Sequence, residues 1–68
     1  MQWRNIDENG KQTTIALESK TWQVIDALSN NHWHEWVYSK LKARPAGSTK
    51  AGWLRSVAID ECSKLIID

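Results

Sequence analysis

The segment that decides the fold is K-Q-T-T-I-A-L-E-S-K-T-W, over residues 11–22. Thr13, Ile15 and Leu17 alternate with smaller or more polar residues, which is the period of a half-buried β-strand. Directly after Leu17 the apolar period becomes helical, and the change begins with an acidic and a hydroxyl residue. The segment therefore predicts a strand over residues 11–17 that leads directly into a helix.

The predicted strand needs a partner, because a lone strand leaves its main-chain donors and acceptors unpaired. No other segment alternates as clearly, so the simplest solution is a two-stranded antiparallel ribbon made by two identical chains. The polar face of this ribbon would consist of Gln12, Thr14 and Ala16. The second choice is a hairpin about the turn signal Asn9-Gly10, pairing residues 3–6 with the strand. Because residues 3–6 alternate poorly, we interpret residues 1–10 as an N-terminal arm.

Length and composition favour one small domain, over residues 11–68, that gains stability by forming a homodimer. A chain of 68 residues is near the lower limit for a self-sufficient core, and its single cysteine excludes an intrachain disulfide. No apolar run reaches the length of a membrane span or a signal peptide, so we expect a cytoplasmic protein. The five tryptophans are interpreted mainly as core residues, with one or two at a partner surface as the alternative.

Apolar periodicity predicts three helices, over residues 19–29, 32–42 and 50–67. Asn30-Asn31 separates the first two, since asparagine tolerates the left-handed conformation at a helix end. The segment Pro45–Gly47 ends the second helix, and Ser48 or Thr49 is a suitable N-cap for the third. The expected fold is therefore mostly α, in the order β-α-α-α.

The charge distribution is informative although the net charge is only +1. Basic side chains without any acidic one occupy residues 36–55, between two segments with an acidic excess. Such a basic segment can contact phosphates, or it can simply be a solvated loop. The candidate phosphate-binding residues, with Lys11 at the ribbon start, are Lys11, Lys40, Lys42, Arg44 and Lys50.

The sequence offers little for catalysis or metal binding, so we expect no enzyme, no cofactor and no metal. His32 and His34 are two residues apart and point to different sides of a helix, unlike an i, i+4 metal-binding pair. Cys62 falls on an apolar helical stripe, where cysteine is usually a small buried hydrophobe rather than a nucleophile.

A two-stranded antiparallel ribbon fits the major groove of B-DNA and can contact base edges with its polar face. The Gln12 amide can bond adenine at two points, Thr14 offers a hydroxyl and a methyl, and Ala16 permits close approach. The start of the second helix, over residues 31–34, would present free N–H groups to a phosphate. The alternative is that the polar ribbon face only meets solvent.

These residues resemble the ribbon-helix-helix (Arc-like) family of DNA-binding proteins. The similarity covers about residues 11–62 and looks closest to a bacterial branch with an extra loop and a third helix. Its motif residues are Thr13, Ile15, Leu17 and Glu18 in the ribbon, Trp22 in the first helix, and Leu54-Arg55 in the third.

The resemblance implies an obligate, intertwined homodimer whose intermolecular ribbon enters the major groove of double-stranded DNA. It assigns base reading to Gln12, Thr14 and Ala16, and a phosphate clamp to His32, Trp33 and His34. Two departures are an uncharged ribbon face and Asn30-Asn31 in place of the usual glycine between the helices. The expected function is a nucleoid-associated transcriptional repressor. The alternative is an antitoxin, or a phage or mobile-element module, that binds a host protein.

Overall fold

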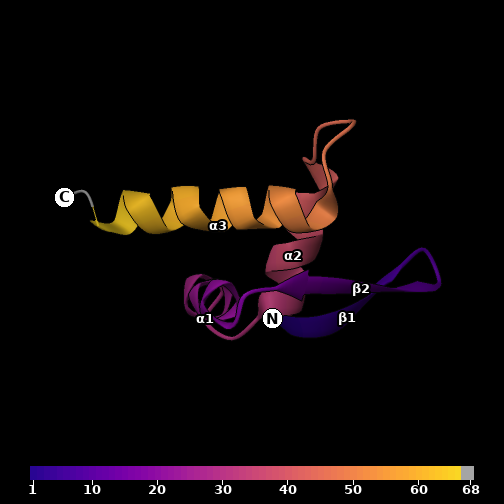
Figure 1. Cartoon of the computed structure of the whole chain (residues 1–68), viewed down its shortest axis with the longest axis horizontal. Coiled ribbons are helices and arrows are strands. Elements are labelled where there is room, and N and C mark those ends of the chain that lie inside the picture. Colours follow the sequence, from indigo (N-terminus) through magenta and orange to yellow (C-terminus); the bar gives the residue numbers. More distant parts are fainter. Residues whose placement is uncertain (67–68) are drawn as a thin grey trace.

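The computed structural model describes residues 1–66, which form a β-hairpin followed by three helices (Figure 1). The elements are β1 (Gln2–Glu8), β2 (Lys11–Leu17), α1 (Ser19–Leu28), α2 (Trp33–Lys42) and α3 (Lys50–Ile66). α3 lies along one side of the molecule, the hairpin and α1 lie along the other, and α2 runs between these sides (Figure 1). The predicted strand and three helices are confirmed, and the end predicted for the last helix, residue 67, lies outside the described residues. No helix within residues 1–66 is long and apolar enough to span a membrane.

The partner of β2 is β1 of the same chain. The two strands pair antiparallel, from Gln2 opposite Leu17 to Glu8 opposite Lys11. Asn9 and Gly10 connect them with φ angles of 52° and 80°. Positive φ at both positions is the geometry of the two-residue turn that matches strand twist, and Asn-Gly is its preferred sequence. The hairpin that the sequence left as second choice is therefore the one observed.

Two expectations from the sequence are corrected by this hairpin. The segment expected as an N-terminal arm contains β1, so the order is β-β-α-α-α rather than β-α-α-α. The ribbon needs no second copy, since both of its strands come from one chain. The intertwined homodimer was inferred because the predicted strand lacked a partner. The hairpin supplies that partner, so this basis for the homodimer no longer applies.

β1 shows no hydrophobic alternation because two of its four inward positions carry charged residues, Arg4 and Glu8. Both nitrogens of the Arg4 guanidinium fork donate to the Asp26 carboxylate of α1, over 2.8 and 3.0 Å. Glu8 forms an ion pair with Lys50 at the start of α3. Paired in this way, charged side chains can lie against a core that otherwise accepts only apolar ones. No hydrophobic alternation marks such a strand.

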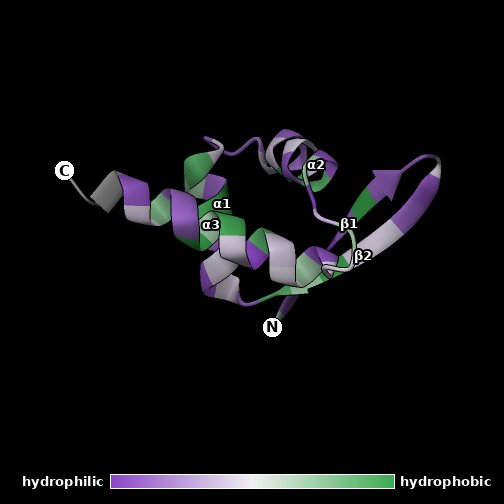
Figure 2. Ribbon diagram, turned by 90° about the horizontal axis from the view of Figure 1, so that it is seen from above, coloured by the Kyte–Doolittle hydropathy of each residue, from purple (hydrophilic) through white to green (hydrophobic). Residues whose placement is uncertain are grey.

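A single hydrophobic core joins the inner face of the hairpin to all three helices. The hairpin contributes three residues and each helix two, and all nine are at most 9% exposed. They are Ile6, Ile15, Leu17, Trp22, Ile25, Trp36, Val37, Leu54 and Ala58. The Trp22 indole N–H lies in this core and donates to the main-chain carbonyl of Gln2 over 2.8 Å, which satisfies the polar end of a buried side chain. Hydrophilic residues instead dominate the tip of the hairpin (Figure 2).

The helix ends follow from local sequence. Asn30 and Asn31 have φ angles of 54° and 68°, and their N–H groups donate to the carbonyls of Ala27 and Asp26. These two bonds form the Schellman motif that closes a helix, with asparagine where glycine is most common. At the start of α3 the Thr49 hydroxyl accepts a hydrogen bond from the Gly52 N–H over 3.1 Å, so Thr49 is the N-cap.

Candidate nucleic-acid interface

The hairpin has an outer face that no helix within residues 1–66 covers. Three cross-strand pairs build it: Trp3 opposite Ala16, Asn5 opposite Thr14, and Asp7 opposite Gln12. Five of the six side chains are exposed and Ala16 is half-buried, while their alternate neighbours Ile6, Ile15 and Leu17 enter the core. We call these six residues the outer face. It contains all three predicted base-reading residues, Gln12, Thr14 and Ala16, side by side on β2.

The main-chain pattern brings the side chains of the outer face close together in pairs. The N–H of Asp7 points away from β2 and donates to the Tyr38 hydroxyl of α2 over 2.7 Å. Asp7 and Gln12 are therefore a non-hydrogen-bonded pair, and by alternation so are the other two pairs of the outer face. Residues in such pairs have Cα atoms about 4.5 Å apart, closer than in the hydrogen-bonded pairs. In the central pair the Thr14 hydroxyl donates to Asn5 Oδ1 over 2.8 Å.

The β1 half of the outer face, which is Trp3, Asn5 and Asp7, was missed from sequence. The available signal was the Asn9-Gly10 turn, because a two-residue turn there fixes Asn5 opposite Thr14. Trp3 is 66% exposed and is the one tryptophan that lies mainly in solvent. The exposure of Trp3 agrees with the alternative interpretation of the tryptophans, and its location at a partner surface stays a prediction.

The predicted phosphate-binding lysines and arginine are not gathered into one basic surface. Lys40 pairs with Glu61 of α3, and Lys50 pairs with Glu8 of β1. The Arg44 guanidinium donates to the Ser48 carbonyl within its own loop. The two ion pairs join residues far apart in the chain, so the charge pattern of residues 36–55 did not predict them. Two of the five predicted phosphate-binding cations are therefore already paired with carboxylates.

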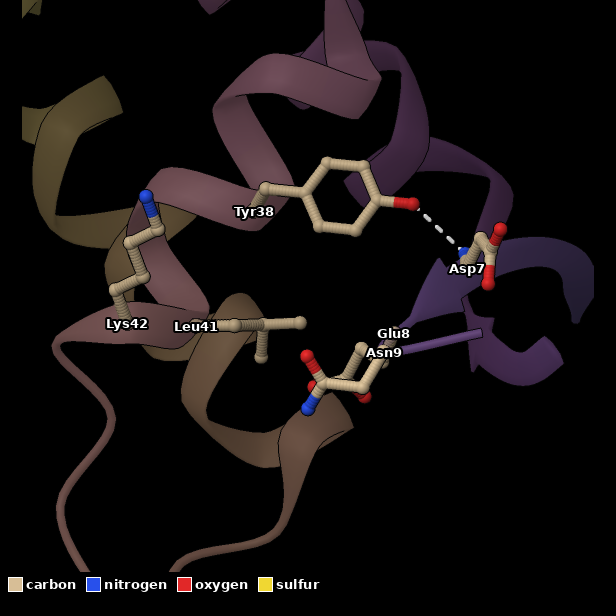
Figure 3. Close-up of a pocket in the computed structure, with 6 residues that line it drawn as sticks. All are labelled: Asp7, Glu8, Asn9, Tyr38, Leu41 and Lys42. Atoms are coloured by element: carbon tan, nitrogen blue, oxygen red, sulfur yellow. Dashed lines mark hydrogen bonds between the residues drawn. The ribbon is translucent and has the colours of Figure 1, made fainter. Parts of the chain in front are cut away.

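Lys11 and Lys42 make no ion pair among the described residues. Lys11 is exposed at the tip of the hairpin, at an inward register position, so it does not belong to the outer face. Lys42 borders an open hollow of about 420 Å³ between α2 and the hairpin tip (Figure 3). The hollow is lined by Asp7, Glu8, Asn9, Tyr38, Leu41 and Lys42. Its two carboxylates make it unsuitable for a phosphate.

The start of α2 lies beside β1. Trp33 contacts Trp22 edge to face, with ring centroids 5.5 Å apart, and the Arg4 guanidinium lies 4.9 Å from the Trp33 ring. His34 stacks on Trp33 at 3.7 Å, and His32 is exposed at the N-cap position. The structure therefore brings the three predicted clamp residues together, next to the strand that carries half of the outer face.

The first turn of α2 has unused hydrogen-bond donors. Among residues 1–66, the main-chain N–H groups of residues 33–35 donate to no other group of the chain, and no side chain caps the helix. Free N–H groups and the helix dipole favour an anion at this end. The Glu35 carboxylate lies in the same turn and reduces that preference.

His32 and His34 join no metal-binding group: within the described part of the chain, no three His, Cys, Asp or Glu side chains lie close enough to hold a metal ion. Cys62 is a free, half-buried thiol on α3. The hydrogen bond at the main-chain amide of Glu18, helped by Arg55 and opposed by slight burial, lowers the pKa of the Glu18 carboxyl.

Comparison with known proteins identifies no relative. No family model matches the chain, and no curated protein or solved structure matches it. The resemblance to ribbon-helix-helix proteins therefore rests on the motif residues alone and stays a prediction. The hairpin, its outer face and the start of α2 are the observations from which a function is argued.

Proposed function

We propose that this chain binds double-stranded DNA, places its hairpin in the major groove, and represses transcription from the nucleoid. The observation that carries the proposal is the outer face: a two-stranded ribbon with exposed amide and hydroxyl side chains. A ribbon of this kind fits the roughly 12 Å width of the major groove. Donor and acceptor groups on it can bond directly to base edges.

The start of α2 supports the same arrangement. Its free N–H groups lie beside β1, at the end of the hairpin opposite the tip. In Figure 1 the first turn of α2 lies at the level of the hairpin, on the side away from α3. A hairpin in the groove would bring a backbone phosphate toward this turn, which can hold the register without reading sequence.

We also propose that the chain self-associates, but not by forming a ribbon between two copies. Each copy already carries a complete ribbon. Pairing the free edges of two β2 strands would make a sheet of four strands, about 19 Å across at ~4.8 Å per strand. This sheet would be wider than the groove, so we propose that two copies insert separate hairpins into successive turns, about 34 Å apart.

The test is a gel-shift series with fragments selected from random duplex DNA. Gln12→Ala and Thr14→Ala each remove a base-contacting group from an exposed position, and each is expected to weaken specific binding by about 1–3 kcal/mol. The matched control is Ser56→Ala, an exposed substitution on α3. Unchanged binding after both hairpin substitutions would show that the outer face does not contact bases.

Salt dependence gives an independent check on the phosphate contacts. Because Lys40 and Lys50 are held by carboxylates, few cations remain to release counterions from DNA. We expect a shallow dependence, with a slope of log affinity against log salt of roughly −2 to −4. A much steeper slope would mean that the ion pairs open on binding.

A protein-interaction module is the second candidate, and one observation favours it. An apolar hollow of about 220 Å³ lies between α1 and α3, lined by Lys20, Thr21, Val24, Ala58 and Ile59. Ile59 is 60% exposed there, which is high for a large apolar side chain. Affinity capture with and without nuclease separates the two functions. A partner that survives nuclease treatment and is lost in Ile59→Asp supports the interaction module; loss of all partners supports DNA binding.

A further inference from the structure

The hydrogen bond between Thr14 and Asn5 gives the centre of the outer face a fixed polarity. The Thr14 hydroxyl donates its hydrogen bond to Asn5 Oδ1 over 2.8 Å. Its oxygen therefore keeps free lone pairs, and the Asn5 amide keeps both of its N–H donors. The pair presents an acceptor beside a donor. Adenine has the complementary edge in the major groove, with the N6 amino donor next to the N7 acceptor.

The two ends of the outer face also carry groups that can contact A·T base pairs. At the tip end the exposed Gln12 amide can bond adenine at two points, and the Asp7 carboxylate opposite it can only accept, for example from an amino group of adenine or cytosine. At the other end Trp3 and Ala16 form an apolar pair, with Trp3 66% exposed. The apolar feature of the major groove is the C5-methyl group of thymine.

Guanine suits the outer face less well than adenine, because the amide N–H donors of this face lie beside acceptors. Its major-groove edge offers two acceptors, N7 and O6, which proteins usually bind with arginine or lysine. None of the six residues is basic, and the Asp7 carboxylate repels acceptors. The arginine of β1, Arg4, points to the opposite face, where Asp26 holds both ends of its guanidinium fork.

Resting on the DNA-binding function proposed above, we propose that the outer face selects A·T-rich duplexes through the major groove, with two residues of β1 as specificity determinants. Asn5, oriented by Thr14, recognises the N7 of adenine, and Trp3 contacts the methyl group of thymine. β1 thus contributes to recognition as much as β2 does.

The experiment compares matched duplexes of about 20 base pairs, two helical turns, which differ only in base chemistry. An A·T duplex is expected to bind at least about tenfold more tightly than a G·C duplex of equal length and charge. Replacing thymine by uracil removes only the C5-methyl group, and replacing adenine by 7-deazaadenine removes only N7. Each change is expected to weaken binding roughly fivefold or more. A matching RNA duplex should bind poorly, because its major groove is too narrow for the hairpin.

Two substitutions assign each effect to a residue. Trp3→Ala is expected to bind thymine and uracil duplexes equally, and Asn5→Ala to bind adenine and 7-deazaadenine duplexes equally. Both side chains are exposed, so the fold should persist, and circular dichroism checks this. The control Ser56→Ala keeps both sensitivities, since it lies on α3, outside the outer face.

The outcomes separate this inference from the function on which it rests. Equal binding of A·T and G·C duplexes would overturn the base preference and leave DNA binding intact. An A·T preference that is insensitive to both modified bases would indicate minor-groove binding and overturn the assignments of Trp3 and Asn5. Binding of the RNA duplex alone, or of no duplex at all, would overturn both proposals.

Discussion

Glu18 occupies a junction where one side chain serves three elements. It follows the last residue of β2 and is the N-cap of α1. Its carboxylate accepts a hydrogen bond from Arg55 of α3 over 3.1 Å and a longer one from Thr21 over 3.4 Å. The pair with Arg55 is the link between the hairpin-to-helix corner and α3. Because the carboxylate is exposed, its contribution to stability is small and depends on pH.

The lowered pKa of Glu18 predicts the direction of that dependence. The folded state binds the Glu18 proton less tightly than the unfolded chain, in which the pKa is near its ordinary value of 4.5. The stabilisation is therefore present above pH 4.5 and is lost as the pH falls through the lower folded pKa. We expect the stability advantage of the natural protein over Glu18→Gln, from urea unfolding, to shrink on acidification below pH 4.5.

A matched control separates this effect from general acid destabilisation. Glu35→Gln removes an exposed carboxylate that makes no ion pair among the described residues. The stability difference between Glu35→Gln and the natural protein is the reference against which the Glu18→Gln difference is compared at each pH. A constant difference for Glu18→Gln at every pH would contradict the prediction.

At the scale of elements, the hairpin depends on its two-residue turn. Gly10 has a φ of 80°, and a methyl group placed on it would meet no atom within 4 Å. The cost of Gly10→Ala is therefore conformational rather than steric, and we expect a loss of about 1 kcal/mol in the free energy of unfolding. Chemical denaturation measures it. Asn9→Gly, which keeps the turn geometry available, should change stability by less than about 0.5 kcal/mol.

Elements with local signals were predictable, and those that depend on distant partners were not. The helices begin and end close to the predicted residues because Asn30, Asn31 and Thr49 act through their own main chain. β1 was only the second choice because Arg4 and Glu8 replace apolar residues at inward positions, and their partners lie in helices far along the chain. No local pattern contains that information.

The candidate site also has a part that local sequence predicts and a part that depends on distant contacts. The β2 half of the outer face followed from alternation alone, whereas the β1 half required the pairing register. For the predicted phosphate-binding residues, the sequence shows the charge of Lys40 and Lys50 but not the carboxylates with which they pair. The sequence shows which side chains are present, but not which other side chains they contact.

At the scale of the whole molecule, the packing of α3 connects the other elements. It packs against α1, α2 and β2, and its Leu54 is fully buried. Leu54→Ala should cost about 2–5 kcal/mol, which is comparable with the whole stability of a small domain. Thermal unfolding followed by circular dichroism should show a largely unfolded protein at moderate temperature. Ile59→Ala on the same helix, exposed to 60%, should keep a cooperative transition near that of the natural protein.

The closeness of the hairpin strands in sequence also bears on how the molecule folds. All pairs of the ribbon lie within residues 2–17, so closing it restricts only a short loop and takes microseconds. A lone hairpin is only marginally stable in water, so it should form and open repeatedly until later segments arrive. The inner face is fully covered once α3 packs against β2 and completes the core. During synthesis the ribbon would thus be the first element to form and among the last to become stable.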